Sequence, residues 1–274
     1  MRIWLILLIV AVSVGVAIGA LVALQRHART GFFRDSHPAG AALQVSGTIF
    51  AVIVGFVLLL AFQSYVNARE AAQDEASATE ALFEIGALLP APARGRVQGD
   101  LICYGRSVVD AEWPAMADGP APSPVTDAWV EEARRGFAAL PAAATDTAAG
   151  ESWLARGAAR QQAREARLGE AEPLVPTTVW ILLLLGGISV VGSVLLFADR
   201  RERLWPAAAV VAAVTTLVVS SLLIVAFLDG AYGSHAGAVT PRAMEGSLAN
   251  MEREWLDDAP AEALPCDASG RAKG

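Results

Sequence analysis

Four long apolar runs without a single Asp, Glu, Lys or Arg constrain this chain more than any other feature. Each contains 22 or more residues, and at about 1.5 Å per residue such a helix reaches roughly 33 Å, enough to cross a hydrocarbon core of roughly 30 Å. The runs are Ile3–Leu24, Val45–Val66, Thr177–Ala198 and Leu204–Leu228. Hydrophobic residues make up 54% of the chain and gather in these runs. We therefore predict a multi-pass integral membrane protein that has the lipid bilayer as its main solvent.

The runs form two pairs, which are separated by a long polar region. This order predicts an all-α membrane protein with four transmembrane helices in a 2+2 arrangement and an inserted extramembrane helical domain. The predicted boundaries are 1–66 for the first pair (about 3–24 and 45–66), 67–176 for the extramembrane domain, 177–228 for the second pair (about 177–198 and 204–228), and 229–274 for a polar C-terminal tail with one short helix.

Both polar regions are acidic, with net charges of −7 over 67–176 and −4 over 229–274. Nucleic acid binding requires a basic surface that can neutralise phosphates, so nucleic acid is excluded as a partner. No cluster of basic residues predicts a lipid headgroup site either.

Arginines in the two short connections predict the orientation. They are Arg26, Arg29 and Arg34 in the first connection, and Arg200, Arg201 and Arg203 in the second. Short cytoplasmic connections carry an excess of basic residues, so the central region and both termini are expected outside the cytoplasm, in the cell membrane. A cleaved signal peptide is the alternative for the first run, but its basic end, Gln25–Arg29, is typical of a stop-transfer flank.

The second apolar run continues into the polar region without a proline until Pro90. One helix is therefore expected from about Ser46 to Leu89, projecting beyond the membrane. Further helices are expected at Val97–Glu112, which Trp113-Pro114 would end, at Asp127–Leu140, which Thr126 would cap, and at Glu151–Leu168.

Nothing in the sequence predicts an enzyme. The three histidines, His27, His37 and His235, do not lie at metal-ligand spacing with another His, Cys or carboxylate. No phosphate-binding loop, dinucleotide fingerprint or nucleophile elbow is present. We therefore expect no catalytic residues, no metal and no cofactor.

Short motifs run in order along most of the chain. They are Gly55-Phe56-Val57, Gln63-Ser64-Tyr65, Glu75-Ala76, Leu88-Leu89-Pro90, Tyr104, Glu112-Trp113-Pro114-Ala115-Met116, Leu228-Asp229, Tyr232-Gly233 and Val239-Thr240-Pro241. Together they resemble the bacterial bestrophin-like domain family, although Ala231 and Tyr232 replace that family's Pro-Phe pair after the last span. The resemblance makes Glu112, Trp113, Pro114 and Asp229 candidates for a site.

The resemblance implies remote kinship with bestrophins, which are pentameric anion channels with a pore lined by the second membrane segment. Bestrophins place most of their extramembrane helices in the cytosol. That arrangement conflicts with the orientation that the arginines predict, and we keep the latter because it comes from these residues.

One face of the second apolar run is a candidate pore lining. At spacings of three and four it carries Thr48, Val52, Phe56, Leu59, Gln63, Val66, Glu70 and Asp74. A ring of such helices would make an apolar constriction at Val52, Phe56 and Leu59, with Gln63 at its wetter end. The alternative is that this face packs against a neighbouring helix. Glu70 and Asp74 would favour cations, which disagrees with the anion selectivity of bestrophins.

Small residues four apart can let membrane helices approach closely. Such pairs are Gly15 and Gly19, Ser189 and Ser193, and Ala209 and Ala213. The partner is either the same chain or a second copy, so a homo-oligomer is one of two interpretations. Two function classes remain: an ion channel, and a non-catalytic membrane scaffold or sensor with a helical domain that binds a partner. The sequence names neither the ion nor the protein partner.

Cys103 and Cys266 are the only cysteines, and four spans place them on the same side of the membrane. A disulfide between them is possible if that side is oxidising. The alternative is a buried apolar thiol and a separate thiol in the tail.

Overall fold

The computed structural model describes residues 3–27, 36–91, 93–197, 204–233, 235, 237–258 and 263–273, and its regular elements are helices. The chain divides into two compact units. The membrane unit consists of Met1–Ser64, Leu174–Asp229 and His235–Gly237, and the helical unit consists of Tyr65–Pro173, Gly230–Ser234 and Ala238–Gly274. The predicted all-α fold is confirmed.

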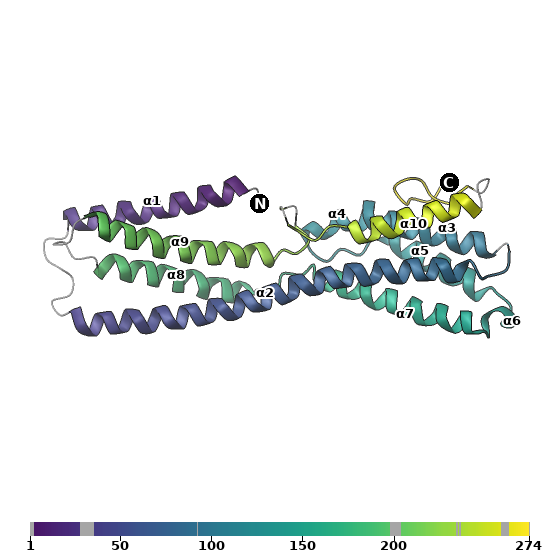
Figure 1. Ribbon diagram of the computed structural model, residues 1–274, viewed down its shortest axis with the longest axis horizontal. Coiled ribbons are helices and arrows are strands. Elements are labelled where there is room, and N and C mark those ends of the chain that lie inside the picture. Colours follow the sequence, from purple (N-terminus) through teal and green to yellow (C-terminus); the bar gives the residue numbers. More distant parts are fainter. Residues whose placement is uncertain are drawn as a thin grey trace. The chain divides into compact units, whose positions relative to one another are not determined.

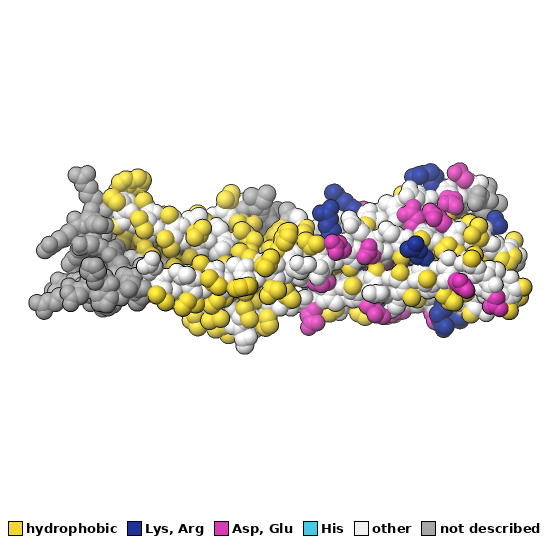
Figure 2. Space-filling view, turned by 60° about the horizontal axis from the view of Figure 1, so that its bottom comes forward, with side chains coloured by type: hydrophobic (Ala, Val, Ile, Leu, Met, Phe, Trp, Pro, Cys, Tyr) yellow, Lys and Arg dark blue, Asp and Glu magenta, His cyan; other side chains and the backbone are white. Residues whose placement is uncertain are grey.

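Four helices are long and apolar enough to cross a membrane, as the sequence predicts. They are α1 (Ile3–His27), α2 (Ser36–Gly86), α8 (Thr177–Phe197) and α9 (Leu204–Leu228) (Figure 1). On the face shown in Figure 2 the side chains of the membrane unit are mostly hydrophobic, whereas charged side chains gather over the helical unit. Five of the six arginines that predict the orientation, Arg29, Arg34, Arg200, Arg201 and Arg203, lie outside the described residues.

The membrane unit is held together by small side chains at points that the sequence analysis missed. A carbon of the Phe50 ring on α2 lies only 2.6 Å from the position that a Cβ on Gly186 of α8 would take. A side chain at this position would collide with the ring, so glycine allows α2 and α8 to approach closely. By contrast, no atom lies within 4 Å of a Cβ built on Gly15 or Gly19. That predicted pair therefore makes no close helix contact within the chain.

α2 is one helix of 51 residues that contributes to both units. The sequence predicts a helix over about 46–89, and the observed one begins ten residues earlier and ends three residues sooner, as its bounds Ser36 and Gly86 show. In the helical unit its buried face consists largely of alanines, including Ala68, Ala72 and Ala76. These small side chains let the larger groups of the other helices pack close to the α2 backbone.

The rest of the helical unit is built from shorter helices. They are α3 (Ala93–Ser107), the π-helix η1 (Val108–Glu112), α4 (Trp113–Ala115), the 3-10 helix η2 (Met116–Asp118), α5 (Pro124–Ala138), α6 (Ala142–Thr145), α7 (Ala148–Gly169) and α10 (Arg242–Asp258).

Two local predictions in this unit have different outcomes. η1 ends at Glu112, where the sequence predicts a helix end, and the chain passes directly into α4, which has Pro114 in its first turn. Thr126 does not cap α5. It is buried inside that helix, which begins at Pro124.

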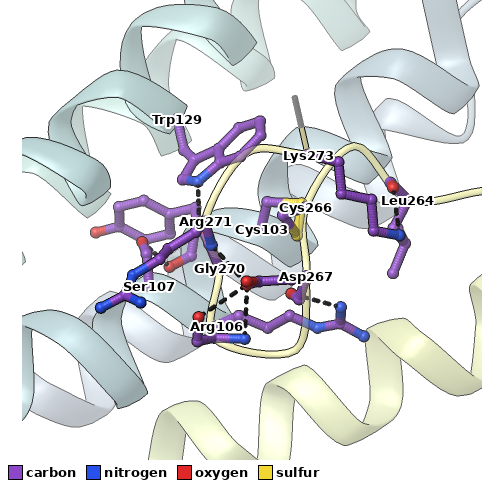
Figure 3. The surroundings of a disulfide bond; sticks show 12 residues. Cys103, Arg106, Ser107, Trp129, Leu264, Cys266, Asp267, Gly270, Arg271 and Lys273 are labelled. Atoms are coloured by element: carbon purple, nitrogen blue, oxygen red, sulfur yellow. Dashed lines mark hydrogen bonds between the residues drawn. A yellow bond between two sulfur atoms is a disulfide. The ribbon is translucent and has the colours of Figure 1, made fainter.

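The tail beyond α10 is part of the helical unit's core. Cys266 forms a disulfide with Cys103 of α3, with 5.7 Å between the Cα atoms. Trp129 Nε1 donates a 2.6 Å hydrogen bond to the carbonyl of Gly270 (Figure 3). Gly270 has a φ of +74°, and a side chain there would collide with the backbone of Ser107. The tail loop is therefore fixed by a covalent bond, a buried hydrogen bond and a close backbone approach.

Candidate functional site

The candidate pore-lining residues on α2 do not pack inside their own chain. Val52, Phe56 and Leu59 are 52%, 64% and 61% exposed, and Gln63 is exposed as well. A face that packed against a neighbouring helix of the same chain would be buried. If this face packs against other groups, they therefore belong to lipid or to a second copy of the chain.

Glu112 is the centre of a buried ion network in the helical unit. Arg164 Nη2 donates to its Oε1 at 2.5 Å, and Arg167 Nη2 donates to its Oε2 at 2.5 Å. The backbone N–H of Ser123 adds a hydrogen bond of 2.9 Å to Oε1. Both Glu112 and Arg167 are fully buried. Both carboxylate oxygens of Glu112 therefore accept hydrogen bonds from other parts of the helical unit.

A second carboxylate completes this network. Arg167 also donates to Glu75 of α2 through Nε and Nη2, and the Tyr104 hydroxyl donates to Glu75 Oε1 at 2.5 Å. Arg160 then donates to the Tyr104 oxygen at 3.1 Å. We call Glu75, Glu112, Arg164 and Arg167 the ion network. It joins α2, η1 and α7, which are distant in sequence.

Electrostatics keep the network charged. Burial opposes ionisation of Glu112, but the hydrogen bond from Arg164 and the charge of Arg167 outweigh it and hold the pKa of Glu112 below its usual value. Burial and then the Glu75 carboxylate raise the pKa of Tyr104. Tyr104 therefore remains a phenol that donates its proton to Glu75 in a hydrogen bond.

Trp113, the second residue of the motif, lies beside this network. The guanidinium of Arg167 is 5.2 Å from the centre of the Trp113 ring, a cation–π distance. The ring also meets Tyr232 edge to face at 5.4 Å, and the Tyr232 hydroxyl donates to the carbonyl of Ala68 on α2 at 2.8 Å. Tyr232 stands where the family pattern has its Pro-Phe pair, so this departure still supplies a buried aromatic ring. Pro114 lies in the first turn of α4, and its carbonyl accepts a hydrogen bond from the backbone N–H of Met116.

Asp229 lies elsewhere, in the membrane unit. Its Oδ1 accepts a 2.8 Å hydrogen bond from the backbone N–H of Val175, and its Oδ2 accepts one of 3.4 Å from Trp180 Nε1. Asp229 thus ties the end of α9 to the start of α8. Within the described residues, no group of His, Cys, Asp or Glu is arranged to hold a metal ion.

The ion network is the main feature that the sequence analysis missed. Arg160, Arg164 and Arg167 recur at four and three residues on α7, which places them on one helical face. That periodicity indicates that α7 has a charged face that contacts another part of the protein. Their partners cannot be read locally, because Glu75 lies 92 residues from Arg167.

Comparisons with known proteins agree with this architecture. A crystal structure of a mutant bacterial bestrophin homologue from Klebsiella pneumoniae is similar with a TM-score of 0.71 and 17% identity, over 92% of this chain and 98% of its own. A second structure of a bacterial bestrophin homologue from Klebsiella pneumoniae gives a TM-score of 0.70 and 16% identity, over 93% and 98%. At such identities the likeness concerns the fold. A search of proteins with curated functions found no match.

The family assignment rests on the sequence itself. Residues 7–235, well over half of the 274 residues, match the bestrophin-like domain family. The match covers most of α1 and the other three membrane helices, together with Glu112 and Asp229 of the resembling motifs. The chain is therefore a member of the bestrophin-like domain family.

Proposed function

We propose that copies of this chain assemble into an ion channel in which α2 lines the pore. The observation that carries the proposal is the exposed face of α2 with Val52, Phe56 and Leu59, which no described part of the same chain covers. One α2 helix cannot enclose a path, so the proposal requires a homo-oligomer. Family membership supports it, because bestrophins use their second membrane segment in this way.

The same face changes character along its length. Beyond the apolar residues it carries Gln63, and then Glu70 and Asp74, all of which are exposed. An apolar constriction followed by polar and then acidic side chains fits a gate that opens by wetting. The acidic residues favour cations at this mouth, whereas the kinship with bestrophins favours anions, and the reversal potential in a salt gradient distinguishes the two.

Phe56→Ala is expected to raise the conductance or the open probability of the reconstituted protein. Removal of the ring widens an apolar constriction and makes it easier to wet. Single-channel recording in planar bilayers measures both quantities. Gln63→Ala is expected to lower the conductance, because it removes the polar group at the wetter end.

Phe62→Ala is the matched control. Phe62 lies on the same helix and is 55% exposed, but around the helix axis it points about 120° away from Phe56 and about 90° away from the centre of the candidate face. Its replacement should leave the currents unchanged. If Phe56→Ala and Phe62→Ala changed the currents equally, or if neither changed them, the result would contradict a pore lined by this face. A purified protein without conductance for any common ion would favour the scaffold or sensor interpretation.

We also propose that the helical unit lies outside the cytoplasm. Two independent observations support this orientation: the arginines of the short connections, and the disulfide between Cys103 and Cys266 in the helical unit. Disulfides persist in oxidising compartments and are rare in the cytosol. The proposed orientation is opposite to that of the bestrophins.

A thiol reagent that cannot cross membranes is expected to label Pro120→Cys in intact cells. His37→Cys, in the connection between the first two spans, should be labelled only after the cells are opened. The unmodified chain is the control for background labelling of its own cysteines. The reverse pattern, with His37→Cys labelled in intact cells, would assign the bestrophin orientation.

A further inference from the structure

The helical unit contains a cavity of about 800 Å³ that the ion network does not use. Its walls come from α3, α5, α10 and the tail loop that the disulfide holds. Small-molecule sites in proteins have volumes of about 300–1,000 Å³. The cavity therefore has the size of a ligand site, and its lining decides which ligand fits.

Three cations that line the cavity form no salt bridge with a carboxylate among the described residues, although the charge of Arg96 acts on Asp100 and that of Arg271 acts on Asp267. Arg96 comes from α3, and Arg271 and Lys273 come from the tail loop (Figure 3). In the described part of the chain none of the three forms an ion pair with an acidic side chain, and Lys273 Nζ donates only to the carbonyl of Leu264, at 3.2 Å. A fourth cation, Arg135, is already paired with Glu132 at 2.8 Å. The cavity thus presents an excess of positive charge.

Asp100 of α3 also lines the cavity and is 2% exposed. Its Oδ2 has no hydrogen-bond partner among the described residues. Burial, followed by the charge of Glu132, raises the pKa of Asp100 to about 7, although Arg96 and Arg135 act in the opposite direction. Near neutral pH this carboxyl is therefore readily protonated, and a small change in its surroundings decides its charge.

The remaining walls are apolar. Trp129 and Trp255 line the cavity from α5 and α10, and Val125 and Pro265 line it as well. Indole rings supply a large flat surface for an apolar or aromatic body.

We propose that this cavity binds a small organic anion with an apolar body, such as an aromatic carboxylate or sulfonate, and that it does so when Asp100 is protonated. The unpaired cations hold the anionic group, and the indole walls hold the apolar body. An ionised Asp100 would repel the ligand. The proposal concerns the helical unit alone and does not depend on ion conduction.

The expected pH dependence follows from this requirement. Because only the protonated form of Asp100 accepts the anion, the dissociation constant rises as the pH rises through about 7, and binding is about tenfold weaker at pH 8 than at pH 6. The charged groups that line the cavity with Asp100 are Arg96, Arg135, Arg271, Lys273 and Glu132, and Glu132 is paired with Arg135.

Isothermal titration calorimetry with naphthalene-2-sulfonate tests the proposal on the whole chain in phosphatidylcholine nanodiscs. The charge of this probe is constant between pH 6 and 8. We expect saturable binding to one site per chain, tighter at pH 6, and much weaker binding of the neutral naphthalene-2-sulfonamide. Empty nanodiscs measure partition into lipid. Heats that match those of empty nanodiscs at both pH values would overturn the proposal.

Variants locate the site. Arg96→Gln and Arg271→Gln should each weaken binding about tenfold, as expected for the loss of one charge-assisted contact. Arg253→Gln is the matched control, because Arg253 is exposed on α10 and does not line the cavity. Asp100→Asn should bind the probe with an affinity that no longer depends on pH. Unchanged binding in both arginine variants, or a pH dependence that persists in Asp100→Asn, would show that the probe binds elsewhere.

Discussion

Replacement of Arg167 by methionine is expected to lower the free energy of unfolding by about 3–5 kcal/mol. Arg167 is fully buried and donates to both Glu75 and Glu112, so its loss leaves two buried carboxylates short of a partner. Methionine keeps a similar apolar stem, which limits the effect of an altered volume. Guanidinium unfolding in detergent, followed by tryptophan fluorescence, measures the change, and Trp113 lies next to the altered side chain.

Arg134→Met is the control for the loss of an arginine charge. Arg134 pairs with Glu131 on the surface of α5, with its side chain 70% exposed, so its loss should leave the free energy of unfolding almost unchanged. Addition of Glu75→Gln to Arg167→Met should recover part of the loss, since it removes one of the unpaired charges. If Arg167→Met were as mild as Arg134→Met, the ion network would not be what stabilises the helical unit.

Loss of the disulfide is expected to lower the free energy of unfolding by about 2–5 kcal/mol. The bond joins residues separated by 163 positions, so it closes a long loop and removes much of the freedom of the unfolded chain. Cys103→Ser with Cys266→Ser should also loosen the tail loop. Trypsin should then cut after Arg271 and Lys273, which the tail loop carries, faster than in the unmodified chain.

Each single serine variant is the matched control, because either one breaks the same bond and should give the same loss as the double variant. Mass spectrometry of the unreduced protein establishes beforehand that the bond is present. Two free thiols in protein taken from an oxidising compartment, or equal stability and equal trypsin resistance after removal of both cysteines, would contradict a stabilising bridge.

The membrane helices could be predicted from the sequence because their signal is local. A run without charges, such as Leu204–Leu228, specifies both a helix and its solvent. The unusual length of α2 could also be predicted, since no proline interrupts its second half. The end at Glu112 could be predicted as well, because a proline is tolerated in the first turn of a helix but not in its interior, and Pro114 lies in the first turn of α4.

The interior of the helical unit could not be predicted from the sequence. The partners of Arg164 and Arg167 come from α2 and η1, and only the folded chain brings them together. Asp100 gives no local signal at all, because a single aspartate in a helix is usually on the surface. For Cys103 and Cys266 the sequence left the disulfide and two separate thiols open, and the structure pairs them.

The fixed tail loop has a consequence for the order of events during synthesis. Residues 65–173 of the helical unit emerge before α8 and α9, whereas Cys266 and Gly270, which complete its core, follow them. If only one of the two later helices inserts, the tail lies on the side of the membrane opposite to Cys103. The disulfide and the core of the helical unit therefore cannot be completed in a chain with that insertion error.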